Sequence, residues 1–247
     1  MDLGLTGRRA LVTGGSRGIG LAIGRALARE GADVALLARG TEAVERAAAD
    51  VAAESGRRVI GIAADTGDDA SVAAAVATVV EQLGGVDVLV NAAATPNTGA
   101  PLSEDALEAE INVKVRGYLR CARAVAPLMV AAGWGRIINI GGLAARQTGT
   151  VVGSVRNVAV AAMTKNLADE LGPQGVNVTV VHPGMTRTER ALDPELERAI
   201  AAGVSIGRIV TAGEVADVVA FLASPRSVAL NGDPVVAGGG VRGPIFY

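Results

Sequence analysis

The chain has 247 residues, of which half are apolar and only 2% are aromatic, and its formal net charge is −2. This length can bury a large aliphatic core, and the charge balance provides no basic surface for nucleic acid or an anionic membrane. The single cysteine, Cys121, cannot form an internal disulfide and is expected to be a small buried apolar residue. Without an apolar run of 18 residues or a secretory leader, the chain is expected to be a cytoplasmic protein with no membrane or nucleic-acid partner.

Seven short apolar runs alternate with longer segments of helical periodicity. Strand–helix alternation of this kind predicts an α/β fold in which a parallel sheet is covered by helices on both faces. We expect one domain over 1–247, in which the irregular segment 184–210 carries a short helix and acts as a lid. In chain order, the seven runs lie at 8–14, 32–38, 57–65, 86–93, 135–142, 176–184 and 234–239.

The first run ends in a glycine-rich loop, Thr13–Gly20, that leads directly into a helical segment. Glycines let the backbone turn tightly and approach a pyrophosphate, whose charge then faces the amides of a helix N-terminus. After the second run, Arg39 stands where an acidic residue would favour NAD(H). Arg39 and Arg17 suit a 2′-phosphate, so the sequence predicts NADP(H), with NAD(H) less favoured. The alternative is that both arginines are solvated surface residues.

Six motifs in chain order resemble those of the short-chain dehydrogenase/reductase family. The resemblance covers nearly the whole chain and implies a Rossmann-type, doubly wound sheet of about seven parallel strands. It also implies a nicotinamide cofactor, a dimer or tetramer, and hydride exchange between the cofactor and an alcohol or carbonyl. The motifs are the loop Thr13–Gly20, Asp65-Thr66, "VNAA" at 90–93, Asn112 in "INVKVRG", "GRIINI" at 135–140 and "HPGMTRT" at 182–188.

The resemblance also implies where a cofactor would lie. At one point the chain departs modestly from the family pattern, because it has "NAAA" at 91–94 where the family usually has "NNAG". The implied phosphate positions are Gly14, Ser16, Arg17, Gly18, Ile19 and Gly20. The implied adenine positions are Asp65 and Thr66, the ribose positions Asn91 and Ala93, and the nicotinamide positions Pro183, Gly184 and Thr188.

The catalytic positions depart much further from the family. The resemblance implies a tyrosine acid, a lysine four residues later and a serine, and these fall on Gly153, Asn157 and Gly142. No Tyr-x-x-x-Lys pattern occurs anywhere in the chain, so the loss does not depend on the alignment. Asn112, which the family uses in a proton relay through water, is retained. Asn157 remains able to hydrogen-bond a ribose hydroxyl, but it cannot act as an ammonium group.

Three functions remain open at this point. The first is a non-catalytic subunit, either a homo-oligomer or a partner of an active relative, assembled through long helices at 104–132 and 151–171. The second is an active NADP-dependent oxidoreductase whose proton donor is His182, a group of the substrate or a water held by Asn112; ordinary packing beneath the cofactor is the alternative for His182. The third is a ligand-binding or sensing protein with a small-molecule pocket at Gly142 and Gly153.

Several further residues could border such a pocket. Arg156 could stabilise an oxyanion, although a solvated or interface position is the alternative. The remaining arginines lie in loops expected around the pocket and could meet an acidic or phosphate-bearing ligand. Tyr247 could reach a neighbouring subunit, with an exposed tail as the alternative. No metal site is predicted. The loop arginines are Arg146, Arg187, Arg190 and Arg208.

Overall fold

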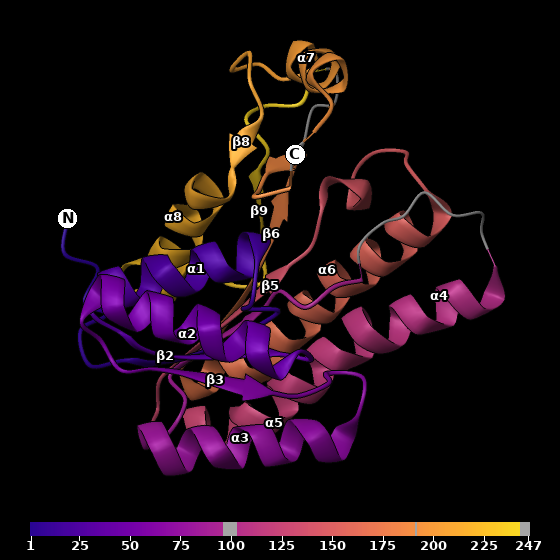
Figure 1. Cartoon of the computed structure of the whole chain (residues 1–247). Coiled ribbons are helices and arrows are strands. Elements are labelled where there is room, and N and C mark those ends of the chain that lie inside the picture. Colours follow the sequence, from indigo (N-terminus) through magenta and orange to yellow (C-terminus); the bar gives the residue numbers. More distant parts are fainter. Residues whose placement is uncertain (96–102, 191, 243–247) are drawn as a thin grey trace.

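The structure is a computed structural model that describes residues 1–95, 103–190 and 192–242 (Figure 1). Seven parallel strands form its main sheet in the order β3-β2-β1-β4-β5-β6-β9. Each strand lies within one of the seven predicted apolar runs, so the Rossmann-type, doubly wound α/β fold is confirmed. The strands are β1 (Arg9–Thr13), β2 (Asp33–Ala38), β3 (Val59–Ala63), β4 (Val88–Asn91), β5 (Gly135–Ile140), β6 (Val176–Pro183) and β9 (Pro234–Ala237).

The segments between the strands are helical. The predicted helix at 151–171 is present, and the one predicted over 104–132 is interrupted by a π-helical segment, η1 (Ile111–Arg116). The α-helices of the described residues are α1 (Gly18–Arg29), α2 (Thr41–Ser55), α3 (Asp69–Leu83), α4 (Glu104–Glu110), α5 (Gly117–Ala131), α6 (Val151–Leu171), α7 (Pro194–Ala202) and α8 (Ala212–Ala223). Three 3-10 turns complete the set, η2 (Leu143–Ala145), η3 (Gly172–Gln174) and η4 (Pro225–Ser227).

Helices cover both faces of the sheet, and each face has its own aliphatic core. On one face, α1, α2 and α8 pack through residues such as Ile23 and Val219, which are fully buried. On the other face, α3, α5 and α6 pack through residues such as Val79 and Leu167. Cys121 belongs to this second cluster and is 1% exposed, as the sequence predicts.

The strand order reverses between β1 and β4, which are neighbours in the sheet although β2 and β3 lie between them in the chain. At such a point the helices that follow the two strands leave on opposite faces, so a crevice opens at the carboxyl ends. Thr13 ends β1 beside Asn91 of β4, and its Oγ1 accepts hydrogen bonds from the amides of Ala92 and Ala93 at 3.0 and 3.1 Å. The glycine loop is thereby fixed against the end of β4.

The segment 184–210 extends beyond the carboxyl ends of the strands, and in Figure 1 its helix α7 lies at the top of the molecule. It contains β7 (Thr186–Arg187), which pairs in parallel with β8 (Val210–Thr211) to form a second, two-stranded sheet. The sequence analysis did not predict this sheet, because two-residue strands carry no periodicity. Asp193 caps α7 by accepting hydrogen bonds from the amides of Glu195 and Leu196.

The residues that the structure describes contain neither a membrane-spanning helix nor a cluster of metal-binding side chains. Across these ranges, no helix is both long enough and apolar enough to cross a lipid bilayer. The same ranges bring no three His, Cys, Asp or Glu side chains together in an arrangement for a metal ion.

Candidate cofactor and ligand site

A cavity of ≈ 1340 Å³ lies along the carboxyl ends of the strands. This volume exceeds the roughly 300–1,000 Å³ of a typical small-molecule site, so it leaves room for a dinucleotide and a second small ligand. Most of the predicted cofactor residues line it, together with Met185 and Glu189 of the predicted lid. The predicted residues in its wall are Gly14, Ser16, Arg17, Gly18, Ile19, Gly20, Arg39, Asp65, Thr66, Ala93, Asn157, Pro183, Gly184 and Thr188.

The glycine loop forms one end of the cavity in a conformation that only glycine allows. Gly14 has φ +67°, and a Cβ there would lie 2.9 Å from the carbonyl oxygen of Ala92. A Cβ on Gly20 would lie 2.2 Å from the carbonyl oxygen of Gly14. The first turn of α1 therefore packs directly on the loop, and its free amides face the cavity.

An anionic group of the protein already lies against this end of the cavity. The amide of Gly18 donates hydrogen bonds to the Glu189 carboxylate, at 2.9 Å to Oε1 and 3.2 Å to Oε2. This carboxylate occupies the place where the N-terminus of α1 would hold a cofactor phosphate. The observed pairing shows that the loop accepts a negatively charged oxygen pair, which fits a dinucleotide pyrophosphate.

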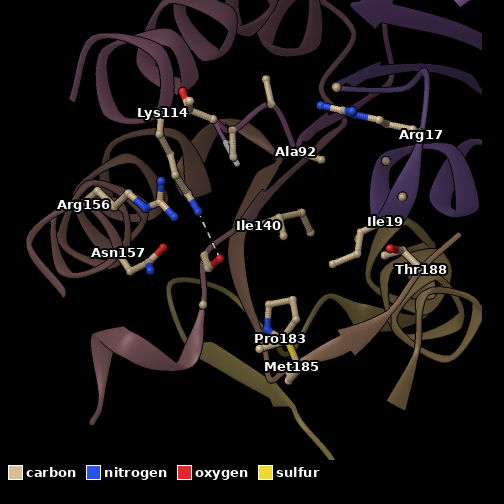
Figure 2. A pocket seen from close by; sticks show the side chains of 18 of the residues that line it. Arg17, Ile19, Ala92, Lys114, Ile140, Arg156, Asn157, Pro183, Met185 and Thr188 are labelled. Atoms are coloured by element: carbon tan, nitrogen blue, oxygen red, sulfur yellow. Dashed lines mark hydrogen bonds between the residues drawn. The ribbon is translucent and has the colours of Figure 1, made fainter. Parts of the chain in front are cut away.

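Arg17 and Arg39 both line the same end of the cavity and are exposed to solvent. In Figure 2, Arg17 extends along the cavity wall above Ile19. Within the described residues, neither guanidinium forms an ion pair with a carboxylate of the chain. Both charges are therefore available to a ligand, as an NADP(H) 2′-phosphate would require.

The predicted adenine positions are held by local hydrogen bonds. The amide of Gly67 donates to Oδ1 of Asp65 at 2.8 Å, and Oγ of Ser71 accepts from the Asp65 amide at 2.9 Å. Thr66 is buried, and its hydroxyl donates to the carbonyl of Val113 in η1 at 3.4 Å. The segment that follows β3 is thus joined to the π-helical segment η1 beside the cavity.

Asn91 does not have the predicted ribose-contacting role. It is fully buried and absent from the cavity wall, and its Nδ2 donates to the carbonyl of Tyr118 at 3.2 Å and to Oδ1 of Asn139 at 2.9 Å. These bonds join β4 to α5 and β5. The side chain is therefore a structural link behind the cavity, so any contact of Asn91 with a ribose would have to come from its main chain, and its cofactor role stays a prediction.

The three positions onto which the sequence comparison places the family's catalytic group carry no acid in this chain. The Nδ2 of Asn157 donates to the carbonyl of Gly153 at 2.8 Å, and its Oδ1 is buried without a partner. Gly142 lines the cavity, and a Cβ there would lie 3.1 Å from Asn157 Nδ2. Gly153 is not in the wall, since its missing Cβ would face Thr150 Oγ1 at 2.8 Å. The predicted pocket therefore borders Gly142 but not Gly153.

Asn112 also lies away from the cavity. Its Nδ2 donates to the carbonyl of Gly67 at 3.2 Å, and it is absent from the cavity wall. The residue of the same segment that does line the wall is Lys114. Asn112 and Lys114 lie in η1, where the wider π-helical turn changes which side chains face the crevice. The helical spacing assumed from sequence is broken here, and this geometry weighs against Asn112 as a proton-relay residue.

Lys114 is the functional candidate that the sequence analysis missed. It is 4% exposed, and its Nζ donates to the carbonyl of Gly141 at 3.1 Å, as the dashed line in Figure 2 shows. Burial, reinforced by the nearby charge of Arg156, lowers its pKa from 10.5 to about 7, and Glu110 opposes this shift. The one sequence signal for a buried Lys114 was its position between Val113 and Val115, because a charged residue within an apolar run is not typical of an exposed helix face.

Arg156 forms an ion pair with Glu110 of α4, and both side chains are mostly buried, 13% and 12% exposed. Its guanidinium lines the cavity beside Lys114, and its Nε has no hydrogen-bond partner. The solvated position weighed from sequence is therefore excluded. The pair is internally neutral, so Arg156 contributes a donor without adding net charge to the cavity.

His182 lies behind the cavity wall and not in it. It is 1% exposed, and its Nδ1 accepts a hydrogen bond from the amide of Gly142 at 3.1 Å, which assigns its proton to Nε2. Burial is the main cause that lowers its pKa to about 4, with smaller effects from Arg146 and Lys114. The imidazole is therefore neutral near pH 7, and its one proton, on Nε2, is not the acidic proton of an imidazolium. These observations weigh against His182 as the substitute proton donor and favour the packing alternative.

The loop arginines are not gathered around one ligand site. Arg190 lines the cavity, whereas Arg187 pairs with Glu197 and Arg208 pairs with Glu214. Arg146 lies near enough to His182 to lower the pKa of that imidazole. Tyr247 lies outside the described residues. The prediction that these arginines surround an acidic ligand therefore holds at most for Arg190.

Comparisons with known proteins match nearly the whole chain. A family model described as Enoyl-(Acyl carrier protein) reductase matches residues 14–242. The "Short-chain reductase protein NovJ" of Streptomyces niveus is 38% identical over 244 residues, covering 94% of this chain and 92% of that protein. L-Sorbose reductase from Gluconobacter frateurii, solved with NADPH and L-sorbose, is 28% identical with a TM-score of 0.93, covering 99% and 100% of the two chains. A short-chain dehydrogenase from Burkholderia cenocepacia J2315, solved with NADP, is 38% identical with a TM-score of 0.86, covering 96% and 98%.

Proposed function

Because the chain belongs to the short-chain dehydrogenase/reductase family of oxidoreductases, we propose that it is a catalytically impaired subunit that binds NADP(H). The cavity retains the parts that hold the cofactor and lacks the parts that move the substrate's proton. Such a chain would act by holding the cofactor, a ligand or a partner subunit.

Binding of NADP(H) is supported by three features of the cavity. The glycine loop accepts an anion at Gly18, and Arg17 and Arg39 provide unpaired charges for a 2′-phosphate. The relatives from Gluconobacter frateurii and Burkholderia cenocepacia were solved with NADPH and NADP. When bound, the nicotinamide would supply or accept hydride, and the buried Oδ1 of Asn157 suits a ribose hydroxyl as its missing donor.

The observation that supports impaired activity is which side chains stand at Asn157 and Gly142. Where the family has an ammonium, Asn157 is an amide bonded to the carbonyl of Gly153, and Gly142 offers no hydroxyl. Loss of a positioned general acid lowers a rate by about 10²- to 10⁴-fold. Lys114 brings a positive charge to the cavity, but among the described residues the phenol beside it, that of Tyr118, is fully buried and donates to the carbonyl of Ile140, and Gly142 offers no serine hydroxyl.

An assembly role is supported by the outer face of α6. Val151, Val155 and Val158 are 57%, 44% and 50% exposed and share one face of the helix through i, i+4 and i+7 spacing. An apolar stripe of this kind on a long helix suits another protein surface. We therefore include in the proposal a homo-oligomer, or a hetero-oligomer with an active relative, formed through this face.

The test restores the missing groups and compares two matched variants. The first combines Gly142→Ser, Gly153→Tyr and Asn157→Lys; the second has Gly153→Phe in place of Gly153→Tyr. Either ring displaces Thr150 Oγ1, which accepts from the Gly153 amide at 3.0 Å, so both lose the α6 cap worth about 1 kcal/mol. They differ in the phenol hydroxyl alone.

We expect the wild-type chain to bind NADPH and to oxidise it with no member of a panel of carbonyl compounds. The tyrosine variant should gain NADPH oxidation and the phenylalanine variant should not. Equal activity of the two variants would contradict a missing proton donor as the deficit. Failure of the wild type to bind NADPH would contradict the proposal at its first step.

A further inference from the structure

Lys114 places a positive charge in the space where the family's catalytic side chains are missing. The side chain comes from η1, next to α6, and its Nζ reaches the carbonyl of Gly141 at 3.1 Å. Gly142 follows directly and leaves its side of the cavity open. Figure 2 shows Lys114, Arg156 and Asn157 converging on this part of the cavity. One ammonium hydrogen is used on Gly141, and two remain for other partners.

The chain does not neutralise this charge. Among the described residues, the ionisable groups around Lys114 are Glu110 from α4, Arg156 from α6, Tyr118 from α5 and His182 from β6. Glu110 is paired with Arg156, so this carboxylate is already neutralised. Tyr118 donates its hydroxyl to the carbonyl of Ile140, and burial raises its pKa well above the usual range. None of the four can act as a counter-ion.

A buried ammonium without a counter-ion is unusual, because lysines are almost never fully buried unless they are paired. The group that neutralises the Lys114 ammonium must be negatively charged and must enter through the cavity. One uncompensated charge balances one negative charge, so a monoanion fits better than a phosphate dianion. The unpartnered Oδ1 of Asn157 repels an anion from its own side, which leaves the face toward Gly142.

We propose that the space beside Lys114 and Gly142 is a binding site for a small-molecule carboxylate, held by the Lys114 ammonium. The site is separate from the phosphate and 2′-phosphate positions at Gly18 and Arg39. The carboxylate oxygen accepts from Nζ, and no bond is made or broken.

The proposal has a measurable consequence for protonation. The pKa of Lys114 is lowered to about 7, so only its protonated form binds a carboxylate strongly. A bound carboxylate favours the ammonium and raises the pKa of Lys114, by about 1 unit at saturation. Binding therefore weakens as the pH rises, by about 7-fold between pH 6 and pH 8.5 for a pKa that binding raises from about 7 to about 8.

The chain is well suited to this test because it has only two lysines, Lys114 and Lys165. Lys165 is exposed and paired with Asp169 at 2.7 Å, which provides an internal reference. The full chain labelled with 13C and 15N in lysine gives two side-chain signals. Each is titrated with pH by NMR in the absence of added carboxylate, with acetate, and with acetamide as the uncharged analogue of the same shape.

Acetate should raise the pKa of Lys114 and leave Lys165 unchanged, and acetamide should move neither. The shift should saturate with acetate concentration, and the apparent affinity for acetate should be about 7-fold weaker at pH 8.5 than at pH 6. An equal response of both lysines would mean bulk salt and would overturn the proposal, as would no response of Lys114. A response to inorganic phosphate but not to acetate would overturn the assignment to a carboxylate.

A matched pair of variants gives an independent measurement by calorimetry. Lys114→Met should abolish acetate binding, while Lys165→Met should retain it. Acetate binding that survives in Lys114→Met would contradict the site. The wild-type NMR titration remains decisive if Lys114→Met folds poorly. NADPH affinity measured on the same samples separates this result from the proposed function, because loss of acetate binding with NADPH binding intact affects the carboxylate site alone.

Discussion

Replacing Lys114 with methionine should raise the free energy of unfolding near neutral pH. The same substitution should remove most of the pH dependence that the unfolding free energy shows in the alkaline range. Methionine has a similar length and carries no charge, and the side chain of Lys114 is only 4% exposed. The neighbouring Arg156–Glu110 pair stays intact in this variant. The substitution therefore removes one buried charge and leaves the surrounding charges balanced.

The magnitude follows from the pKa of Lys114, which falls from 10.5 in its usual state to about 7 in the folded chain. Between these two values the unfolded chain binds more protons, so stability rises with pH, by at most about 1.4 kcal/mol per pH unit. Below about pH 7 both states are protonated and the full cost of the buried charge is present. Replacing buried ionic groups with apolar residues typically stabilises a protein by up to about 4 kcal/mol.

The assay is denaturant unfolding of wild type, Lys114→Met and Lys165→Met at a series of pH values from neutral to alkaline. The difference between wild type and Lys114→Met should be largest at neutral pH and shrink as the pH approaches 10. Lys165→Met should show no such convergence, because Lys165 is exposed and paired with Asp169, which raises its pKa. A constant difference between wild type and Lys114→Met across the series would refute a lowered pKa at Lys114.

Three further changes test the cofactor end of the cavity and the fold. Glu189→Gln removes the charge that faces the amide of Gly18 and should tighten NADPH binding by about 2- to 5-fold in a fluorescence titration. Glu195→Gln on the same segment is the control and should leave NADPH affinity unchanged. Arg39→Ala should weaken NADPH binding by about 5- to 20-fold while NADH binding changes little, and an equal loss for both would remove Arg39 from 2′-phosphate recognition. Thr211→Val breaks the capping box of α8 and should lower the unfolding free energy by about 1 kcal/mol, measured by denaturant titration; no loss would show that the cap is dispensable.

Local patterns were enough to predict the main sheet. Each apolar run needs only its own residues and the turn residues around it to indicate a strand, and the seven runs became β1 to β6 and β9. The lid was recognised as irregular, although its two-stranded sheet was not. The glycine loop was likewise predictable, because Gly20 is required by a steric contact with Gly14 within the same strand–loop–helix unit, whereas the contact that requires Gly14 is with Ala92 after β4.

The site was harder to predict, because its contacts join residues distant in the sequence. Glu189 meets Gly18 across 171 positions, and His182 is held by the amide of Gly142. Neither pairing leaves a local pattern. Lys114 could not be identified from sequence spacing, because the π-helical segment changes the helical spacing and brings Lys114 to the cavity in place of Asn112. Sequence spacing therefore predicts where the family's catalytic positions fall, but not the charge that lies beside them.

Binding of NADP(H) without the chemistry of the family's tyrosine is tested by mixing excess homogeneous wild-type chain with NADPH and following nicotinamide fluorescence and absorbance together over a panel of carbonyl compounds. We expect a fluorescence change that saturates on binding and no loss of NADPH absorbance. A first-order loss of NADPH in the wild type, absent when the chain is omitted, would contradict it.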